Sequence, residues 1–186
     1  MPLQRVVAEQ INFARALHRG DVEAVRASLA RGADPTEALS HCASADMATA
    51  LLAAGASADY PPDDPPIVAL AWRGHTDALA VVIAAKADLE ASCRFTEKRA
   101  LMMAALHGQR AAVTMLLEAG AYVDARDLAG LTALHHAATS THPQRRAVAE
   151  LLLAAGADRS ARTDRGLTAL ELARAAGHAD LVELLG

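Results

Sequence analysis

Hydrophobic residues recur along the chain at helical spacing, in short segments that begin and end near glycine. In residues 108–120, GQRAAVTMLLEAG, the apolar positions Val113, Leu116 and Leu117 fall on one face of a helix. The same pattern returns in the following copy, at Val148, Leu151 and Leu152. Each segment therefore predicts a short helix that buries one stripe of apolar side chains.

The helical segments form a repeat. GDVEAVRASLARG, GHTDALAVVIAAK and GQRAAVTMLLEAG have the same length, and GHADLVELLG begins a further copy at Gly177. Lys86 once takes the place of the closing glycine. A residue directly after a helix often adopts the left-handed conformation, which costs glycine least. The pattern thus predicts that each helix stops at this position and that a sharp turn follows.

A second, shorter helix is predicted upstream of each of these. LTALHHAA at 131–138 and LTALELAR at 167–174 are nearly the same sequence, and Thr132 and Thr168 suit an N-cap. The predicted unit is therefore helix, tight turn, helix, glycine stop and extended loop. It recurs after 34 residues between Lys86 and Gly120, a period typical of repeat architectures.

GAYVDARDLAGLTALHHAA, residues 120–138, resembles the ankyrin repeat pattern G-A-D-V-N-A-x-D-x-x-G-x-T-P-L-H-x-A-A at most positions. GADRSARTDRGLTALELA resembles it too, with Thr163 in the aspartate position. The resemblance implies an all-α fold, a solenoid of helix-turn-helix units with short hairpin-like loops. It implies one domain over residues 1–186, with units at approximately 3–33, 34–57, 58–89, 90–122, 123–158 and 159–186. A tetratricopeptide array, the main alternative, would have longer helices and no extended loop.

The second unit departs from the pattern. Gly32 and Gly55 are only 23 residues apart, against about 33 in the family, so the hairpin is missing. Asp34 is expected to cap a helix there, with Pro35 in its first turn and Glu37 completing a capping box.

The loop before the third unit is YPPDDPP. Proline fixes the backbone φ angle and donates no N–H, so a stiff, acidic hairpin tip is expected at Tyr60–Pro62. Asp64 is expected to cap the next helix, with Pro65 and Pro66 in its first turn, where missing N–H groups cost nothing.

Composition narrows the class of protein. Hydrophobic residues make up 53% of the chain but aromatic ones only 3%, which favours thin layers of closely packed helices. The net charge is −4, so no bulk basic charge points to nucleic acid. The apolar runs are far shorter than the ~20 residues that span a bilayer, which argues against a membrane protein.

No signal peptide is visible at the N-terminus, so a cytoplasmic location is expected; an export signal trimmed from the chain stays open. Two separated cysteines fit a reducing compartment. Arginine outnumbers lysine sixteen to two, and alanine is abundant, which suggests a GC-rich, bacterial genome.

The resemblance implies binding of a protein partner through the concave surface, by a monomer when free. The expected contact residues lie on the first helices and hairpin tips: Arg15, Arg19, Asp63, Asp64, Trp72, Arg73, Arg94, Phe95, Met103, Leu106, His107 and His136. Trp72 and Phe95 are expected to lie in one apolar patch with a basic edge, and tryptophan, tyrosine and arginine dominate interface hot spots. A sharper hypothesis is an inhibitor or immunity-type protein that covers another protein's active site.

The sequence contains no GxSxG, HExxH, P-loop or GxGxxG motif, so no enzyme, cofactor or metal site is predicted. The eight histidines include no HxxxH pair, and tetrahedral zinc needs three or four converging ligands. Two alternatives stay open: a metal-binding or enzymatic protein that uses concave-face histidines, and a small-molecule sensor.

Overall fold

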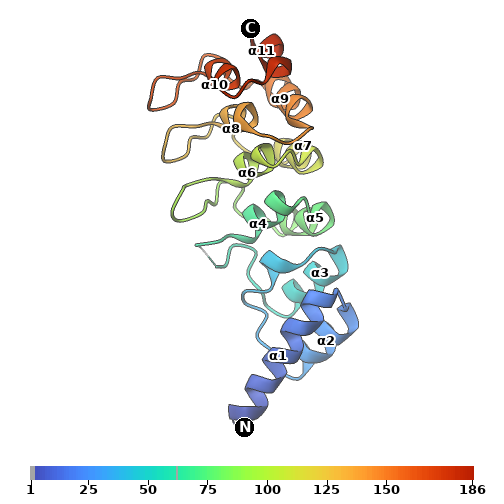
Figure 1. Cartoon of the computed structure of the whole chain (residues 1–186). Coiled ribbons are helices and arrows are strands. Elements are labelled where there is room, and N and C mark those ends of the chain that lie inside the picture. Colours follow the sequence, from blue (N-terminus) through green and yellow to red (C-terminus); the bar gives the residue numbers. More distant parts are fainter. Residues whose placement is uncertain (1–2, 62) are drawn as a thin grey trace.

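The computed structural model describes residues 3–61 and 63–186, which form an elongated stack with the N-terminus at one end and the C-terminus at the other (Figure 1). The described residues form helices and no strand, which confirms the all-α prediction; an isolated bridge pairs Ser92 with Arg99. The elements are α1 (Leu3–Arg19), α2 (Val22–Ala30), the 3₁₀ helix η1 (Leu39–His41), α3 (Ala45–Ala53), α4 (Pro66–Arg73), α5 (Thr76–Ala84), α6 (Ala100–Leu106), α7 (Arg110–Glu118), α8 (Ala133–Thr139), α9 (Arg145–Ala154), α10 (Ala169–Ala175) and α11 (Ala179–Leu185).

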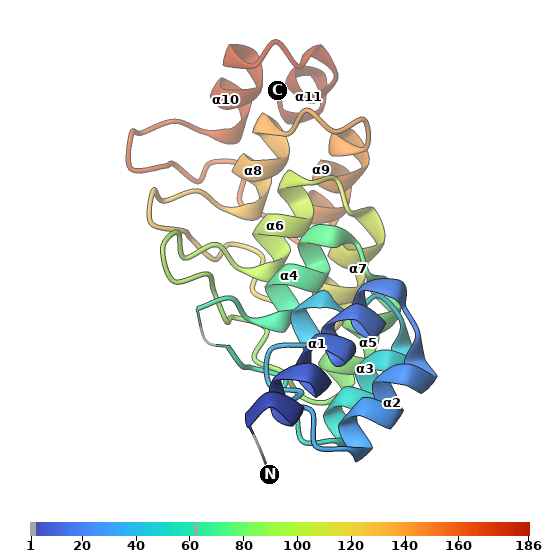
Figure 2. The same cartoon turned by 60° about the horizontal axis from the view of Figure 1, so that its bottom comes forward.

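The helices are arranged in two rows. We call α4, α6, α8 and α10 the inner helices; each packs on the next, and Figure 2 shows them following one another along the stack. α5, α7, α9 and α11 form the outer row, and the long loops project beside the inner row (Figure 1). Consecutive helices therefore pair as predicted, whereas the exact bounds of the six units stay a prediction.

The core between the rows is thin and rich in alanine. Leu116, Leu134 and Leu152 are fully buried, and small residues such as Ala104 and Ala137 fill the spaces between neighbouring helices. Small side chains let helix backbones approach closely while the interior keeps the density of an organic crystal. This packing accounts for a hydrophobic sequence with few aromatic residues.

The predicted helix ends are confirmed. Gly120 and Gly156 close their helices with φ of 96° and 91°, and Lys86 adopts the same left-handed region with φ of 66°. Thr168 caps α10 by accepting from the Glu171 backbone N–H at 3.3 Å, and the Glu171 carboxylate accepts in return from the Thr168 N–H at 2.7 Å.

The capping box predicted at residues 34–37 is wrong. The Asp34 carboxylate accepts from the Thr36 backbone N–H at 2.9 Å, which makes a turn, and an α-helix does not follow. The Gln10 side chain of α1 accepts from the Asp34 N–H at 3.0 Å, and this N–H is the donor that the Glu37 carboxylate would have bonded in a capping box. Only the three residues of η1 therefore stand where the other helix pairs have a full inner helix.

After the proline-rich loop, helix α4 begins one residue later than predicted. Pro66 is the first helical residue and Pro65 the N-cap, so both prolines lie where no backbone donor is needed. Asp64 precedes the N-cap and makes no capping hydrogen bond, so the expectation that Asp64 caps α4 is wrong. The expectation for Pro62 lies outside the described residues.

Candidate functional site

A cluster of side chains lies where inner helices α4 and α6 end. The Trp72 ring lies 5.6 Å from the His107 ring, with 51° between their planes, and the Arg73 guanidinium lies 5.0 Å from the Trp72 ring centroid. Trp72 nevertheless remains 41% exposed. We call Trp72, Arg73 and His107 the Trp72 cluster; it joins two successive helix pairs through ring and cation–π contacts.

The Trp72 cluster is held in place by the units on either side. Gln109 Nε2 donates to the Trp72 carbonyl at 3.1 Å, and Arg73 donates to the Ser40 carbonyl at 2.9 Å. Burial lowers the pKa of His107, and positive charge at Lys98 acts in the same direction. His107 is therefore mainly neutral at pH 7, so its tilted ring packs against Trp72 without repelling Arg73.

Met103 and Leu106 of α6 are half-buried, so each keeps part of its surface available beside the Trp72 cluster. The Leu106 carbonyl accepts from the Ser140 hydroxyl at 2.6 Å, which ties α6 to the next inner helix. Of the predicted contact residues on α6, these two are thus partly accessible.

His136 is not available to a partner, which corrects the prediction. It is 4% exposed, and its Nε2 donates to the Asp127 carboxylate at 2.9 Å. Burial lowers the pKa of His136, against the attraction of Asp127. A neutral imidazole therefore serves as a buried structural donor.

Asp63, Arg94 and Phe95 form a second cluster at the hairpin tips. Arg94 donates to the Asp63 carboxylate at 2.9 Å and lies 5.9 Å from the Phe95 ring centroid, while Phe95 is 83% exposed. Asp64 beside them is exposed. The tips precede the inner helices, whereas Trp72 lies near the end of α4, about 12 Å of helix further on. The residues expected in a single patch thus form two clusters, one at the hairpin tips and one at the ends of α4 and α6.

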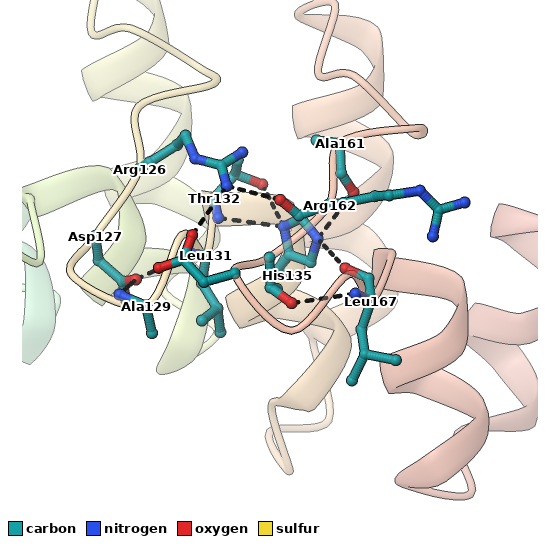
Figure 3. Close-up of polar contacts among 11 residues, drawn as sticks. Arg126, Asp127, Ala129, Leu131, Thr132, His135, Ala161, Arg162 and Leu167 are labelled. Atoms are coloured by element: carbon teal, nitrogen blue, oxygen red, sulfur yellow. Dashed lines mark hydrogen bonds and ion pairs between the residues drawn. The ribbon is translucent and has the colours of Figure 1, made fainter.

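Successive hairpins are locked together. The Leu128 N–H donates to the Thr96 carbonyl at 3.3 Å, and the Asp164 N–H donates to the Ala129 carbonyl at 3.1 Å. Figure 3 shows two further links, in which Arg126 donates to the Arg162 carbonyl and His135 bonds the carbonyls of the next loop. These bonds hold the tips in a row, as a preformed surface requires.

Other histidines also bond backbone carbonyls of neighbouring units. His135 Nε2 lies 3.1 Å from the Ala161 carbonyl and 3.2 Å from the Leu167 carbonyl. His75 and His178 reach back to carbonyls of the preceding unit, those of Cys42 and Ala138, at 3.1 Å and 3.0 Å.

Arg15 and Arg19 are exposed on α1, as predicted, although neither belongs to either cluster. Arg19 lines a groove that runs beside the end of α1 toward α4, and Arg73 lines its opposite side. Nothing in the sequence pattern predicted this groove, which follows from the shortness of η1.

The described residues offer little for nucleophilic or metal chemistry. Cys42 is buried, its thiol donates to the Leu39 carbonyl, and burial raises its pKa to about 11. No group of three or more His, Cys, Asp or Glu side chains among the described residues could hold a metal ion. None of the described helices has the length and apolarity needed to cross a membrane.

The fold and its exposed clusters define a class: a solenoid of stacked helix pairs with a rigid face of inner-helix ends and hairpin tips. Residues 101–186 match the family model of ankyrin repeats, in three copies. The crystal structure of EF0377, an ankyrin repeat protein, is similar with a TM-score of 0.77 and 26% sequence identity, over 94% of this chain and 96% of that chain. No curated protein matches. Residues 101–186 are therefore ankyrin repeats, and the chain as a whole has the fold of an ankyrin repeat protein; ankyrin repeats generally mediate protein–protein interactions.

Proposed function

We propose that the protein is a non-enzymatic interaction module that binds one protein partner through its inner face, with Trp72 as the main anchor. The observation that carries this proposal is the exposure of the chain's lone tryptophan, at 41%, on the face where the inner helices end. Tryptophan and arginine are the residues most enriched in interface hot spots.

The Trp72 cluster is suited to binding because it is already ordered. Arg73 and His107 contact the Trp72 ring, and Gln109 holds the Trp72 backbone carbonyl, so little side-chain entropy is lost when a partner docks. A tryptophan side chain has roughly 200 Å² of surface, of which the exposed share is roughly 80 Å². Burying that area contributes about 2 kcal/mol, or roughly thirtyfold in Kd.

The test is affinity capture from the source organism, followed by titration of the purified partner. We expect wild type to capture a partner that Trp72→Ala binds roughly thirtyfold more weakly. Tyr122→Ala is the matched control, because Tyr122 is a large exposed aromatic residue that lies after outer helix α7. Equal binding by wild type and Trp72→Ala would refute the proposal.

A sharper form of the proposal is that the partner is an enzyme whose active site the inner face covers. A rigid surface of this kind can block a cleft without changing its own shape. The test is the activity of the captured partner with and without a saturating amount of this protein. Unchanged activity would limit the function to scaffolding or tethering.

A further inference from the structure

The shortness of η1 opens a groove in the inner side of the stack. Inner helices α4 and α6 have eight and seven residues, whereas η1 has three. The chain then runs extended from Cys42 to Ser44 before α3 begins. A groove of about 570 Å³ consequently lies between the end of α1 and the end of α4.

The walls of the groove carry basic side chains from three separate segments. Arg19 and His18 come from α1, His41 from η1, and Arg73 and His75 from the end of α4 and the turn after it. None of the residues that line this groove is a carboxylate. Because the whole chain has a net charge of −4, this concentration of basic side chains is local to the groove.

Arg19 and Arg73 differ in how they are held. Arg73 donates to the Ser40 carbonyl, which places its guanidinium at the groove edge. Arg19 is exposed and makes no ion pair with any described residue. A guanidinium with unused donors favours carboxylate ligands, which it can bind in a bidentate manner.

The rest of the groove is apolar. Leu17, Ala43 and Met47 contribute to its lining between the basic groups. Glu37 lies in the adjoining trough along α1, so the basic stretch is bounded at that end. A ligand that fits this arrangement carries carboxylates at intervals and apolar side chains between them.

We propose that this groove binds an acidic, leucine-bearing peptide segment of the partner protein, with Arg19 and Arg73 holding its carboxylates. This inference rests on the proposed function, because it names the chemistry of a segment that the inner face receives. Charge complementarity supplies the selection, and the apolar floor distinguishes a peptide from a nucleic acid, whose backbone offers only phosphates and sugars.

The direct test uses fluorescein-labelled hexapeptides and the full chain, followed by fluorescence anisotropy. We expect the peptide ELEELE to bind saturably, the neutral peptide QLQQLQ to bind at least about tenfold more weakly, and added salt to weaken ELEELE. Arg19→Gln should weaken ELEELE by about tenfold, since it removes one charge-assisted hydrogen-bonding group. The matched control is Arg174→Gln, at an exposed arginine in the last turn of α10 at the far end of the stack.

Three results would overturn the groove assignment: equal binding of ELEELE and QLQQLQ, no effect of Arg19→Gln, or tighter binding of a hexathymidylate oligonucleotide than of ELEELE. Because Arg19 is exposed, Arg19→Gln should keep the far-UV circular dichroism and melting temperature of wild type. Arg73→Gln also removes the bond to Ser40, so it serves as a second variant.

The outcome is separable from that of the proposed function. If ELEELE fails to bind while Trp72→Ala still weakens partner capture, only the groove assignment fails. If Arg19 controls ELEELE binding while partner capture is indifferent to Trp72→Ala, the proposed function with Trp72 as its anchor fails, whereas the groove assignment stands.

Discussion

Asp127→Ala should be among the most damaging single substitutions in this chain. The Asp127 carboxylate accepts from the backbone N–H groups of Ala129 and Leu131 at 2.9 Å and 3.0 Å, and from His136 Nε2 at 2.9 Å. Burial opposes ionisation, but the hydrogen bonds from Leu131, Ala129 and His136 prevail and lower the pKa of Asp127. The folded protein therefore holds a buried carboxylate with three donors.

The magnitude follows from the donors that Asp127→Ala leaves behind. One hydrogen bond to a charged group is worth about 1.5–3 kcal/mol, and two backbone donors lose partners as well. We expect the free energy of unfolding to fall by about 3–4 kcal/mol. Asp127→Asn keeps an acceptor for the backbone and should cost about half as much.

Thr163 offers a matched comparison, because it occupies the Asp127 position of the next unit. Its hydroxyl accepts from the Leu167 N–H at 3.2 Å and has no histidine donor. Thr163→Val should therefore cost only about 1 kcal/mol. The reasoning would be refuted if Asp127→Ala lowered the free energy of unfolding by no more than Thr163→Val does.

Urea unfolding at pH 7 measures these differences. Circular dichroism at the helix band follows all helix pairs, whereas fluorescence of Trp72 follows α4 and its neighbours. Coincident transitions would show that the stack unfolds as one unit and would license a single free energy. Separate transitions would place the loss from Asp127→Ala in the C-terminal units.

Three further predictions concern backbone conformation and pH. Lys86→Gly should stabilise the protein by about 1 kcal/mol, because φ of 66° strains a residue with a Cβ atom; an unchanged or lower melting temperature would contradict this. Gly20→Ala should cost about 1 kcal/mol for its positive φ, and Gly74→Ala about 2 kcal/mol because its Cβ would also meet the Gln109 side chain; equal costs in urea unfolding would exclude that collision. Lowering the pH from about 7.5 to about 5.5 should reduce the free energy of unfolding, because the unfolded chain binds protons more readily at histidines whose folded pKa is lowered; melting temperatures that stay level or rise would refute it. Those histidines are His107, His135 and His136.

The helix pairs could be predicted because local physics determines them. Apolar spacing selects a face, and a left-handed residue such as Gly120 or Lys86 ends the helix whatever surrounds it. The threonine at Thr168 likewise needs only its own helix to act as a cap. Features of this kind are readable from a dozen residues.

What could not be predicted depends on contacts between distant segments. His136 looks exposed on its helix, but Asp127 reaches it from the hairpin and buries it. The helix expected at Asp34 fails because Gln10, from α1, takes the backbone donor that its capping box needs. In both cases a side chain from elsewhere in the fold changes the outcome, and periodicity contains no information about it.

Arg73 connects the two parts of the proposed binding face. Its guanidinium lies 5.0 Å from the Trp72 ring centroid and also bonds the Ser40 carbonyl, next to the groove that the short η1 leaves open. Lysine could not do both, because stacking on an aromatic face and directed donation to an oxygen require a planar group with several donors. A partner that covers Trp72 therefore also meets the basic wall of the groove. The loss of an inner helix thus opens a groove that a regular array would lack, and this groove lies beside Trp72, the proposed aromatic anchor.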